Sequence, residues 1–297
     1  MRRFEYVAPA SLADAVQALA SQPQGSRPLA GGTDLVIHMK ERGRRVPALV
    51  SLRNVREIDG LSEDAHGGLR IGAMTKAGDV AASPVVRQRH PGISDGADLV
   101  GSIQIRNRGT IGGNFCNAAP SADVVPPIVA SGATLRVVGP DGERTVASEQ
   151  FFVGPGNTVL KHGEILADIN IPAAPAHTGS AYLRHVPRRE MDIAVVGVAV
   201  QLTLNDAHDT ITDARVVLAS VAPTPIRAYG AEAALKGKAA NEATLTAAGE
   251  AAASDARPIT DVRGSDDYRR ELLKVYTRRA AQIALDRARG VSNGRSH

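Results

Sequence analysis

Two short stretches, each built on a pair of adjacent glycines, constrain this chain most. One is Ala30-Gly31-Gly32-Thr33-Asp34, and the other runs from Gly109 to Asp123 and contains Gly112-Gly113-Asn114. Glycine permits positive φ and lets a ligand approach backbone N–H groups with no Cβ in the way. Consecutive N–H groups in such bends form concave anion sites. The pair predicts a fold that brings both stretches to one elongated anion, with a dinucleotide diphosphate as the obvious candidate.

Each stretch also has a purely structural interpretation. The first is compatible with a tight strand-to-helix turn in which Asp34 caps the following helix. The second is compatible with a turn in which Asn117 and Asp123 hold loops together. In the ligand interpretation, Thr110 donates to phosphate, Asn114 offers a donor and an acceptor, and Asp123 accepts from a ribose diol. The polar, glycine-rich composition between apolar segments favours the ligand interpretation of the second stretch.

The composition is that of an ordinary globular protein with two or three domains. The 297 residues are 43% hydrophobic and 22% charged, so a real core can form. Only 3% are aromatic and none is Trp, which argues against a platform for single-stranded nucleic acid. The net charge of +4 comes from scattered arginines, and we interpret clusters such as 42–45 as solvated surface. We therefore expect no nucleic-acid partner.

The single cysteine, Cys116, excludes an internal disulfide, a four-cysteine iron–sulfur site and a structural zinc site. We interpret it as a small packed residue and not as a nucleophile. The eight histidines show no metal-ligand spacing, so we expect any redox metal in another chain. No apolar run approaches the roughly 20 residues that span a bilayer, and residues 2–7 do not resemble an export signal. The default expectation is a cytoplasmic protein without a membrane partner.

Periodicity and turn residues predict a chain of the α+β class. Strand–helix–strand units do not alternate throughout, which argues against a doubly wound parallel sheet. We expect helices capped by Ser11, Thr75 and Ser265, and a hairpin around Gly139-Pro140-Asp141-Gly142. The best linker is 172–179. The predicted strands are 4–7, 48–52, 69–73, 134–138, 143–146, 164–171, 180–185, 193–204 and 211–221, and the predicted C-terminal helices are 228–235, 242–253 and 266–289, the last with an apolar core-facing stripe.

The chain resembles the flavoprotein, or medium, subunit of the molybdenum hydroxylases, the family of xanthine dehydrogenase and carbon monoxide dehydrogenase. The resemblance rests on several motifs in the same order: Ala30–Asp34, Gln104–Asn107, Thr110–Asp123, Phe152–Gly156, Glu164–Leu166 and Met191–Val196. It implies a two-lobed vanillyl-alcohol-oxidase (PCMH)-type FAD-binding domain, followed by a C-terminal domain of a three-stranded antiparallel sheet with helices. The expected boundaries are 1–53 and 54–175 for the two lobes, 178–290 for the C-terminal domain and 291–297 for a disordered tail.

The resemblance also implies which residues hold FAD. Residues 29–35 and 110–114 would hold the diphosphate, Asp123 the ribose, and Leu166 the adenine or ribitol end. Arg184 would lie near the flavin and raise its potential, and residues 188–190 would lie close to the isoalloxazine. No catalytic or metal-ligating residue is assigned to this chain. The expected FAD-binding residues are Leu29, Ala30, Gly31, Gly32, Thr33, Asp34, Leu35, Thr110, Ile111, Gly112, Gly113, Asn114, Asp123, Leu166 and Arg184.

The implied function is electron transfer. Electrons would come from [2Fe-2S] clusters of a small subunit, supplied by a large molybdopterin subunit, and would leave through FAD to NAD⁺, O₂ or another acceptor. The implied assembly is a dimer of heterotrimers. Met191 stands where some xanthine dehydrogenases carry an acid, which leaves the oxidant open, and the substrate pocket belongs to another subunit. The alternatives are a stand-alone flavin reductase or oxidase, which would purify as an active coloured monomer, and a non-enzymatic basic binding protein, which would be colourless.

Overall fold

A computed structural model describes residues 2–188 and 191–291. Its N-terminal part is a parallel three-stranded sheet in the order β1 (Glu5–Val7), β3 (Ala48–Ser51) and β2 (Arg27–Leu29). Helix α1 (Leu12–Ser21) begins where predicted, because Ser11 Oγ accepts a hydrogen bond from the Asp14 N–H at 3.1 Å. Its apolar face is buried as the periodicity predicts. The first double glycine connects β2 to helix α2 (Leu35–Lys40).

The second sheet is antiparallel, and β10 (Ile165–Ile171) lies at its centre. The predicted hairpin is confirmed, since Gly139 pairs with Gly142 across the two-residue turn Pro140-Asp141. The strand order is β4 (Leu61–Glu63), β5 (Leu69–Gly72), β10, β6 (Thr134–Gly139) and β7 (Gly142–Ala147). A short hairpin of β8 (Phe152–Gly154) and β9 (Asn157–Thr158) stands beside it.

Six short helices lie between β5 and β6 in the sequence. They are α3 (Ala77–Ala82), α4 (Pro84–Arg89), α5 (Pro91–Asp98), α6 (Ile103–Arg106), α7 (Ile111–Asn117) and α8 (Val125–Ala130), and one-turn 3-10 helices span Arg56–Ile58 and Ser148–Gln150. The expected cap at Thr75 is wrong. Lys76 occupies the N-cap position of α3, and the Thr75 hydroxyl donates to the Gly60 carbonyl at 2.9 Å instead.

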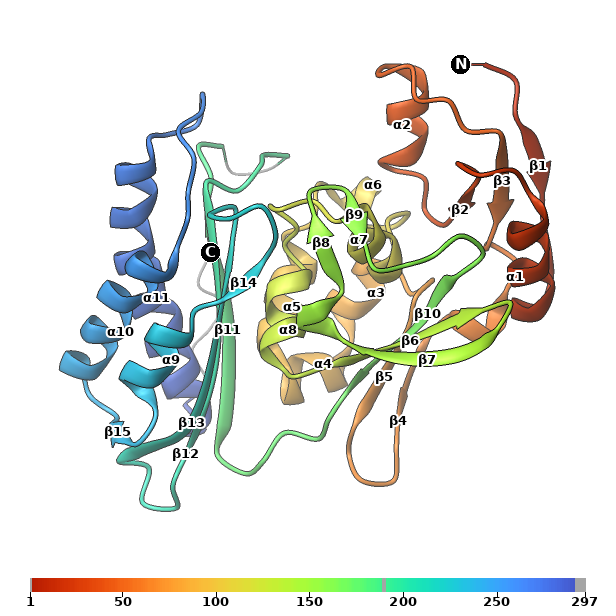
Figure 1. The fold of residues 1–297 in the computed structure, drawn as a ribbon. Coiled ribbons are helices and arrows are strands. Elements are labelled where there is room, and N and C mark those ends of the chain that lie inside the picture. Colours follow the sequence, from red (N-terminus) through yellow and green to blue (C-terminus); the bar gives the residue numbers. More distant parts are fainter. Residues whose placement is uncertain (1, 189–190, 292–297) are drawn as a thin grey trace.

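The C-terminal sheet contains the three predicted antiparallel strands, β11 (Thr178–His185), β12 (Val196–Leu204) and β13 (Thr210–Ala219). Two short strands, β14 (Ile226–Arg227) and β15 (Lys238–Ala239), pair with β13. The helices that follow are α9 (Tyr229–Leu235), α10 (Glu242–Asp255) and α11 (Asp266–Ala288), and they cover one face of this sheet (Figure 1). Ser265 caps α11 as predicted, and the apolar stripe of α11 lies in the core. Within the described residues, no helix combines the length and apolarity needed to cross a bilayer.

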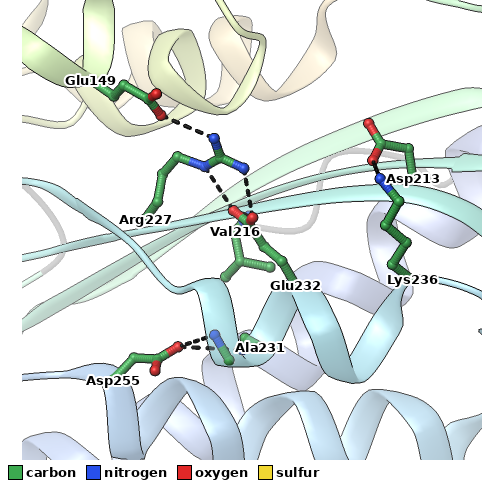
Figure 2. Close-up of polar contacts among 9 residues, drawn as sticks. Glu149, Asp213, Val216, Arg227, Ala231, Glu232, Lys236 and Asp255 are labelled. Atoms are coloured by element: carbon green, nitrogen blue, oxygen red, sulfur yellow. Dashed lines mark hydrogen bonds and ion pairs between the residues drawn. The ribbon is translucent and has the colours of Figure 1, made fainter.

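The other face of the C-terminal sheet packs against α5 and α8, so the sheet lies between two helical layers (Figure 1). Among the described residues, three ion pairs cross this junction, and in each the carboxylate comes from the N-terminal side and the arginine from the C-terminal sheet and helices. They are Asp95–Arg287, Asp123–Arg184 and Glu149–Arg227. Figure 2 shows the third, in which Arg227 also pairs with the buried Glu232 at 2.6 Å. These contacts fix the C-terminal sheet and helices against α5, the end of the second glycine stretch and the 3-10 helix Ser148–Gln150.

Candidate functional site

The two glycine stretches border one cavity of about 480 Å³, a volume typical of ligand pockets. The walls come from the β2–α2 connection, the start of α7 and the segment before and within β10. The predicted meeting of two distant stretches is therefore confirmed. Thirteen of the fifteen expected residues line this cavity: Leu29, Ala30, Gly31, Gly32, Thr33, Asp34, Leu35, Thr110, Ile111, Gly112, Gly113, Asn114 and Leu166.

Direct contacts hold the two stretches together. A Cβ on Gly31 would lie 2.1 Å from the carbonyl oxygen of Arg108, so only glycine allows the backbones to approach this closely. The Asn117 side-chain amide donates to Asp34 Oδ1 at 3.1 Å, and the Thr33 hydroxyl donates to Asp34 Oδ2 at 3.3 Å. Asp34 occupies the N-cap position of α2 without making a capping hydrogen bond, so its role is to link the stretches rather than to cap the helix.

The first stretch presents a row of free backbone N–H groups. Nothing in the described part of the chain accepts a hydrogen bond from the N–H groups of residues 31–35. Gly32 has φ +76°, which turns the backbone through the left-handed region in the middle of this row. Successive unpaired N–H groups in such a bend form a concave anion-binding surface. The free N–H groups of residues 31–35 therefore fit the predicted phosphate or diphosphate ligand.

The second stretch differs from the expectation, because its N–H groups are already used. The N–H groups of Ile111 and Gly112 donate to the carbonyls of Thr75 and Ala73, each at 2.9 Å. Those of Gly113 and Asn114 donate to the hydroxyl and the carbonyl of Thr110, each at 3.0 Å. The expectation that both stretches offer free amides is therefore wrong for residues 111–114, which form the first turns of α7.

The glycine at 112 serves packing rather than ligand approach. A Cβ there would lie 2.5 Å from the Cβ of Ala73, at the end of β5. What the second stretch does offer the cavity is a side-chain atom. Asn114 Oδ1 is buried and has no hydrogen-bond partner in the described structure. A buried acceptor without a donor is costly, so this oxygen favours a ligand that donates to it.

Asp123 and Arg184 are the two expected residues that do not line the cavity. They pair with each other at 2.5 Å, and the Tyr182 hydroxyl donates to the other oxygen of Asp123 at 2.9 Å. Burial raises the pKa of Asp123 to about 6, while the Arg184 charge and the two hydrogen bonds oppose this shift. The next residue, Val124, does line the cavity, so the pair lies just behind its wall. The ribose-binding and flavin-contacting roles of Asp123 and Arg184 stay predictions.

Other expectations concern residues at or near the cavity. Cys116 is exposed on the cavity wall and not packed in the core, while the surrounding protein raises the pKa of its thiol to about 12, which supports the expectation that it is not a nucleophile. The backbone N–H and guanidinium of Arg188 bond to the Asp192 carboxylate, whereas Arg189 and Glu190 lie outside the described residues. Residues 292–297 of the expected 291–297 tail lie outside them as well.

Sequence reasoning missed the cationic part of the cavity. Arg27, Arg44, His38 and Lys161 all line it, and neither arginine forms an ion pair within the described residues. Burial and the nearby Arg44 charge lower the pKa of Arg27. Such a pair of uncompensated guanidinium groups favours an anionic ligand. The signal was available, since Arg27 stands two residues before Leu29, but the 42–45 cluster was interpreted as solvated surface.

These features together fit FAD. The free amides of 31–35 and the cations suit its diphosphate, and Asn114 Oδ1 suits a donor on the ligand. A second buried atom without a partner, Ser26 Oγ, lies on the cavity wall as well. Apolar walls from residues such as Ile111 and Leu166 suit the rings.

Comparison with known proteins agrees with this geometry. Residues 2–174 match the family model for the FAD binding domain in molybdopterin dehydrogenase, and residues 181–284 match the CO dehydrogenase flavoprotein C-terminal domain. The carbon monoxide dehydrogenase medium chain of Hydrogenophaga pseudoflava is 35% identical over 285 residues, covering 96% of this chain and 98% of that protein. The xanthine dehydrogenase FAD-binding subunit of Escherichia coli O157:H7 is 34% identical over 282 residues, covering 95% and 96%.

Solved structures are equally similar. A carbon monoxide dehydrogenase structure from Hydrogenophaga pseudoflava superposes with a TM-score of 0.91 at 37% identity, covering 96% of this chain and 98% of that one. Quinoline 2-oxidoreductase from Pseudomonas putida 86 superposes with a TM-score of 0.88 at 32% identity, covering 98% of both chains. The α+β architecture expected from the sequence is thereby confirmed. The chain belongs to the family of FAD-binding medium subunits of the molybdenum hydroxylases and is the flavoprotein component of such an oxidoreductase.

Proposed function

We propose that this chain carries electrons from a partner subunit to a terminal acceptor in a heterotrimeric molybdenum hydroxylase. The electrons come from [2Fe-2S] clusters of a small subunit and leave to NAD⁺, O₂ or another acceptor. Bound FAD supplies the redox chemistry, and the protein binds and tunes it. The observation that carries the proposal is the row of unpaired amides at residues 31–35, which faces the same cavity as the unpartnered Asn114 Oδ1.

Each wall of the cavity has a distinct role in this proposal. The amides of 31–35 hold the diphosphate, with Arg27 and Arg44 neutralising its charge. Asn114 Oδ1 accepts a hydrogen bond from the ligand and fixes its position along the cavity. Ile111 and Leu166 exclude water from the ring system. The Asp123–Arg184 pair sits behind the wall, so direct contact with the ribose or the flavin requires the two side chains to separate from each other.

The proposed assembly follows from the relatives, two of which are named as one chain or subunit of a dehydrogenase. We expect a small iron–sulfur subunit and a large molybdopterin subunit to bind this chain, and two such heterotrimers to associate in the cytoplasm. The rival function is a stand-alone flavin reductase or oxidase, which needs no partner.

Affinity purification of the chain from its native host tests the proposal. We expect two further subunits to co-elute, with molybdenum and iron in the complex, and the visible flavin band to bleach when the substrate of the large subunit is added without air. The matched experiment uses Gly31→Ala, which should leave the iron–sulfur bands reducible but lower the flavin content of the complex. A yellow monomer that turns over by itself would contradict the proposal in favour of the stand-alone enzyme. A colourless protein would favour a binding role.

A further inference from the structure

Two histidines meet at one end of the C-terminal sheet, away from the residues that line the FAD cavity. His177 directly precedes β11, and His208 lies in the turn between β12 and β13. Nε2 of His208 is 2.8 Å from Nδ1 of His177, and the ring centroids are 4.4 Å apart. Both side chains are half-buried. The two residues are 31 positions apart, so their sequence spacing gives no sign of the pair.

The backbone positions both rings at a conformational cost. His177 has φ +56° and His208 has φ +59°, in the left-handed region that is uncommon for residues other than glycine, with histidine among the side chains that enter it more often. The main chain is nevertheless held firmly. The Leu204 N–H donates to the His177 carbonyl at 3.0 Å, and the His208 N–H donates to the Asn205 carbonyl at 2.9 Å. Strain at both members of one contact is typical of a functional arrangement.

The separation of the two nitrogens suits a shared metal ion. With metal–nitrogen bonds of about 2.0–2.1 Å, two ligands at a right angle are about 2.9 Å apart, and at a tetrahedral angle about 3.4 Å apart. The observed 2.8 Å is just below this range, and both rings must also turn so that their nitrogen lone pairs converge on the ion. Imidazole is a preferred ligand of zinc, copper and nickel.

The surroundings of the pair contain carboxylates. Asp206 Oδ1 lies 3.7 Å from Nε2 of His177, the nitrogen that does not face His208. A carboxylate in that position orients a metal-binding histidine and raises its basicity. Asp209, in the same turn, is held by hydrogen bonds from the side chains of Asn205 and Thr210 at 2.8 and 2.9 Å and places a second carboxylate beside the pair. Arg289 donates to the His208 carbonyl at 3.2 Å and brings one opposing positive charge.

We propose that His177 and His208 form a binding site for a divalent transition-metal ion of the zinc, copper and nickel class, with water completing the coordination. The ion takes the place of the proton shared between the two nitrogens, and the His208 ring keeps its proton on Nδ1. Nε2–H of His177 then continues to face Asp206. The ion ties the start of β11 to the β12–β13 turn and stabilises this end of the sheet. The proposal is independent of the FAD site.

Zinc titration by calorimetry into the full-length, FAD-loaded chain tests this site. Asparagine tolerates positive φ, so His177→Asn and His208→Asn should keep the backbone conformation while removing one ligand. We expect each substitution to weaken zinc binding by at least about tenfold, because a single imidazole remains. Asp206→Asn should weaken it by less than either histidine substitution, because this exposed carboxylate acts only through His177. The matched control is His66→Asn in the exposed β4–β5 turn, which should bind zinc like the parent chain.

A second measurement separates loss of the site from loss of the fold. Zinc should raise the melting temperature of the parent chain and of His66→Asn, but not that of His177→Asn or His208→Asn. The flavin absorbance should be the same in all four proteins, which reports that the fold is intact. Equal zinc affinity in the parent chain and in both histidine variants would overturn the proposal, as would a parent chain that does not bind zinc.

Discussion

The two double-glycine segments look alike in sequence and differ in the structure. At residues 31–35 the backbone N–H groups have no acceptor within the described chain, whereas at 111–114 all four donate to nearby oxygens. Both segments are crowded, but by different neighbours. Gly31 is approached by the Arg108 carbonyl of the other segment, and Gly112 by Ala73 at the end of β5. A glycine pair therefore predicts that another group lies close to the backbone. That group can be a ligand where the N–H groups of the pair are free, and it is part of the protein where they are already hydrogen-bonded.

The largest expected effect is that of Gly31→Ala on FAD binding. The new Cβ meets the Arg108 carbonyl at 2.1 Å and forces the two segments apart, so we expect FAD affinity to fall about 10- to 100-fold, equivalent to about 1–3 kcal/mol of overpacking. Quenching of flavin fluorescence on binding measures this. Gly154→Ala is the matched control, because no atom lies within 4 Å of its new Cβ. Unchanged affinity in Gly31→Ala would mean that the segments need not meet.

Gly112→Ala should lower the stability of the fold and leave FAD binding nearly unchanged, in contrast to Gly31→Ala. Its Cβ meets Ala73 inside the packed contact between α7 and β5, so we expect the free energy of unfolding to fall by about 1–3 kcal/mol. Because the N–H groups of 111–114 do not face the ligand, the FAD affinity of the folded fraction should change little. Urea unfolding of the FAD-free chain and flavin titration give the two numbers. A large loss of FAD affinity with normal stability would contradict the assignment of residues 111–114 to packing and of residues 31–35 to ligand binding.

The Asp123–Arg184 pair behind the wall predicts a pH dependence of stability. The folded-state pKa of Asp123, about 6, exceeds the ordinary 3.8, so the folded chain holds this proton more tightly than the unfolded chain. Its contribution is therefore fully present below about pH 4 and is lost as pH rises through about 6. Relative to Asp123→Asn, the parent chain should lose about 1 kcal/mol of stability between about pH 5 and pH 7. Parallel pH profiles of the two proteins would contradict the assignment.

Asn114→Ala should have the smallest effect, and that effect should be confined to FAD binding. Its Oδ1 has no partner in the described protein, so its removal should leave the stability unchanged or slightly improved. Loss of one hydrogen bond to the ligand should weaken FAD binding about fivefold, corresponding to about 1 kcal/mol. If stability fell and affinity did not, Asn114 would belong with Gly112 as a structural residue.

Most of the fold could be predicted because its signals are local. Ser11 and Ser265 cap the helices that they precede, and the Pro140-Asp141 turn closes its hairpin, since each depends on neighbours within four residues. The cap at Thr75 failed because a tertiary partner, the Gly60 carbonyl, competes for its hydroxyl. The residues that line the cavity could be identified because two glycine pairs stand beside Thr, Asn and Asp side chains, whereas a third pair, Gly67-Gly68, does not line it.

The roles of those residues could not be predicted in the same way. Whether the N–H groups of Ile111 and Gly112 are free depends on the carbonyls of Thr75 and Ala73, which lie more than 30 positions earlier in the chain. Arg27 and Arg44 look like ordinary surface charges until the fold places both on one wall. The pairing of Asp123 with Arg184 likewise joins residues that are 61 positions apart in the chain.

Hydrogen exchange of individual amides, measured with and without FAD, tests the central claim most directly. In the FAD-free chain we expect the amides of residues 31–35 to exchange rapidly and those of 111–114 to be protected already. Saturating FAD should then slow exchange at 31–35 by at least about tenfold and leave 111–114 nearly unchanged. Rapid exchange at 31–35 in the FAD complex, or new protection confined to 111–114, would contradict the assignment of the diphosphate to the first segment.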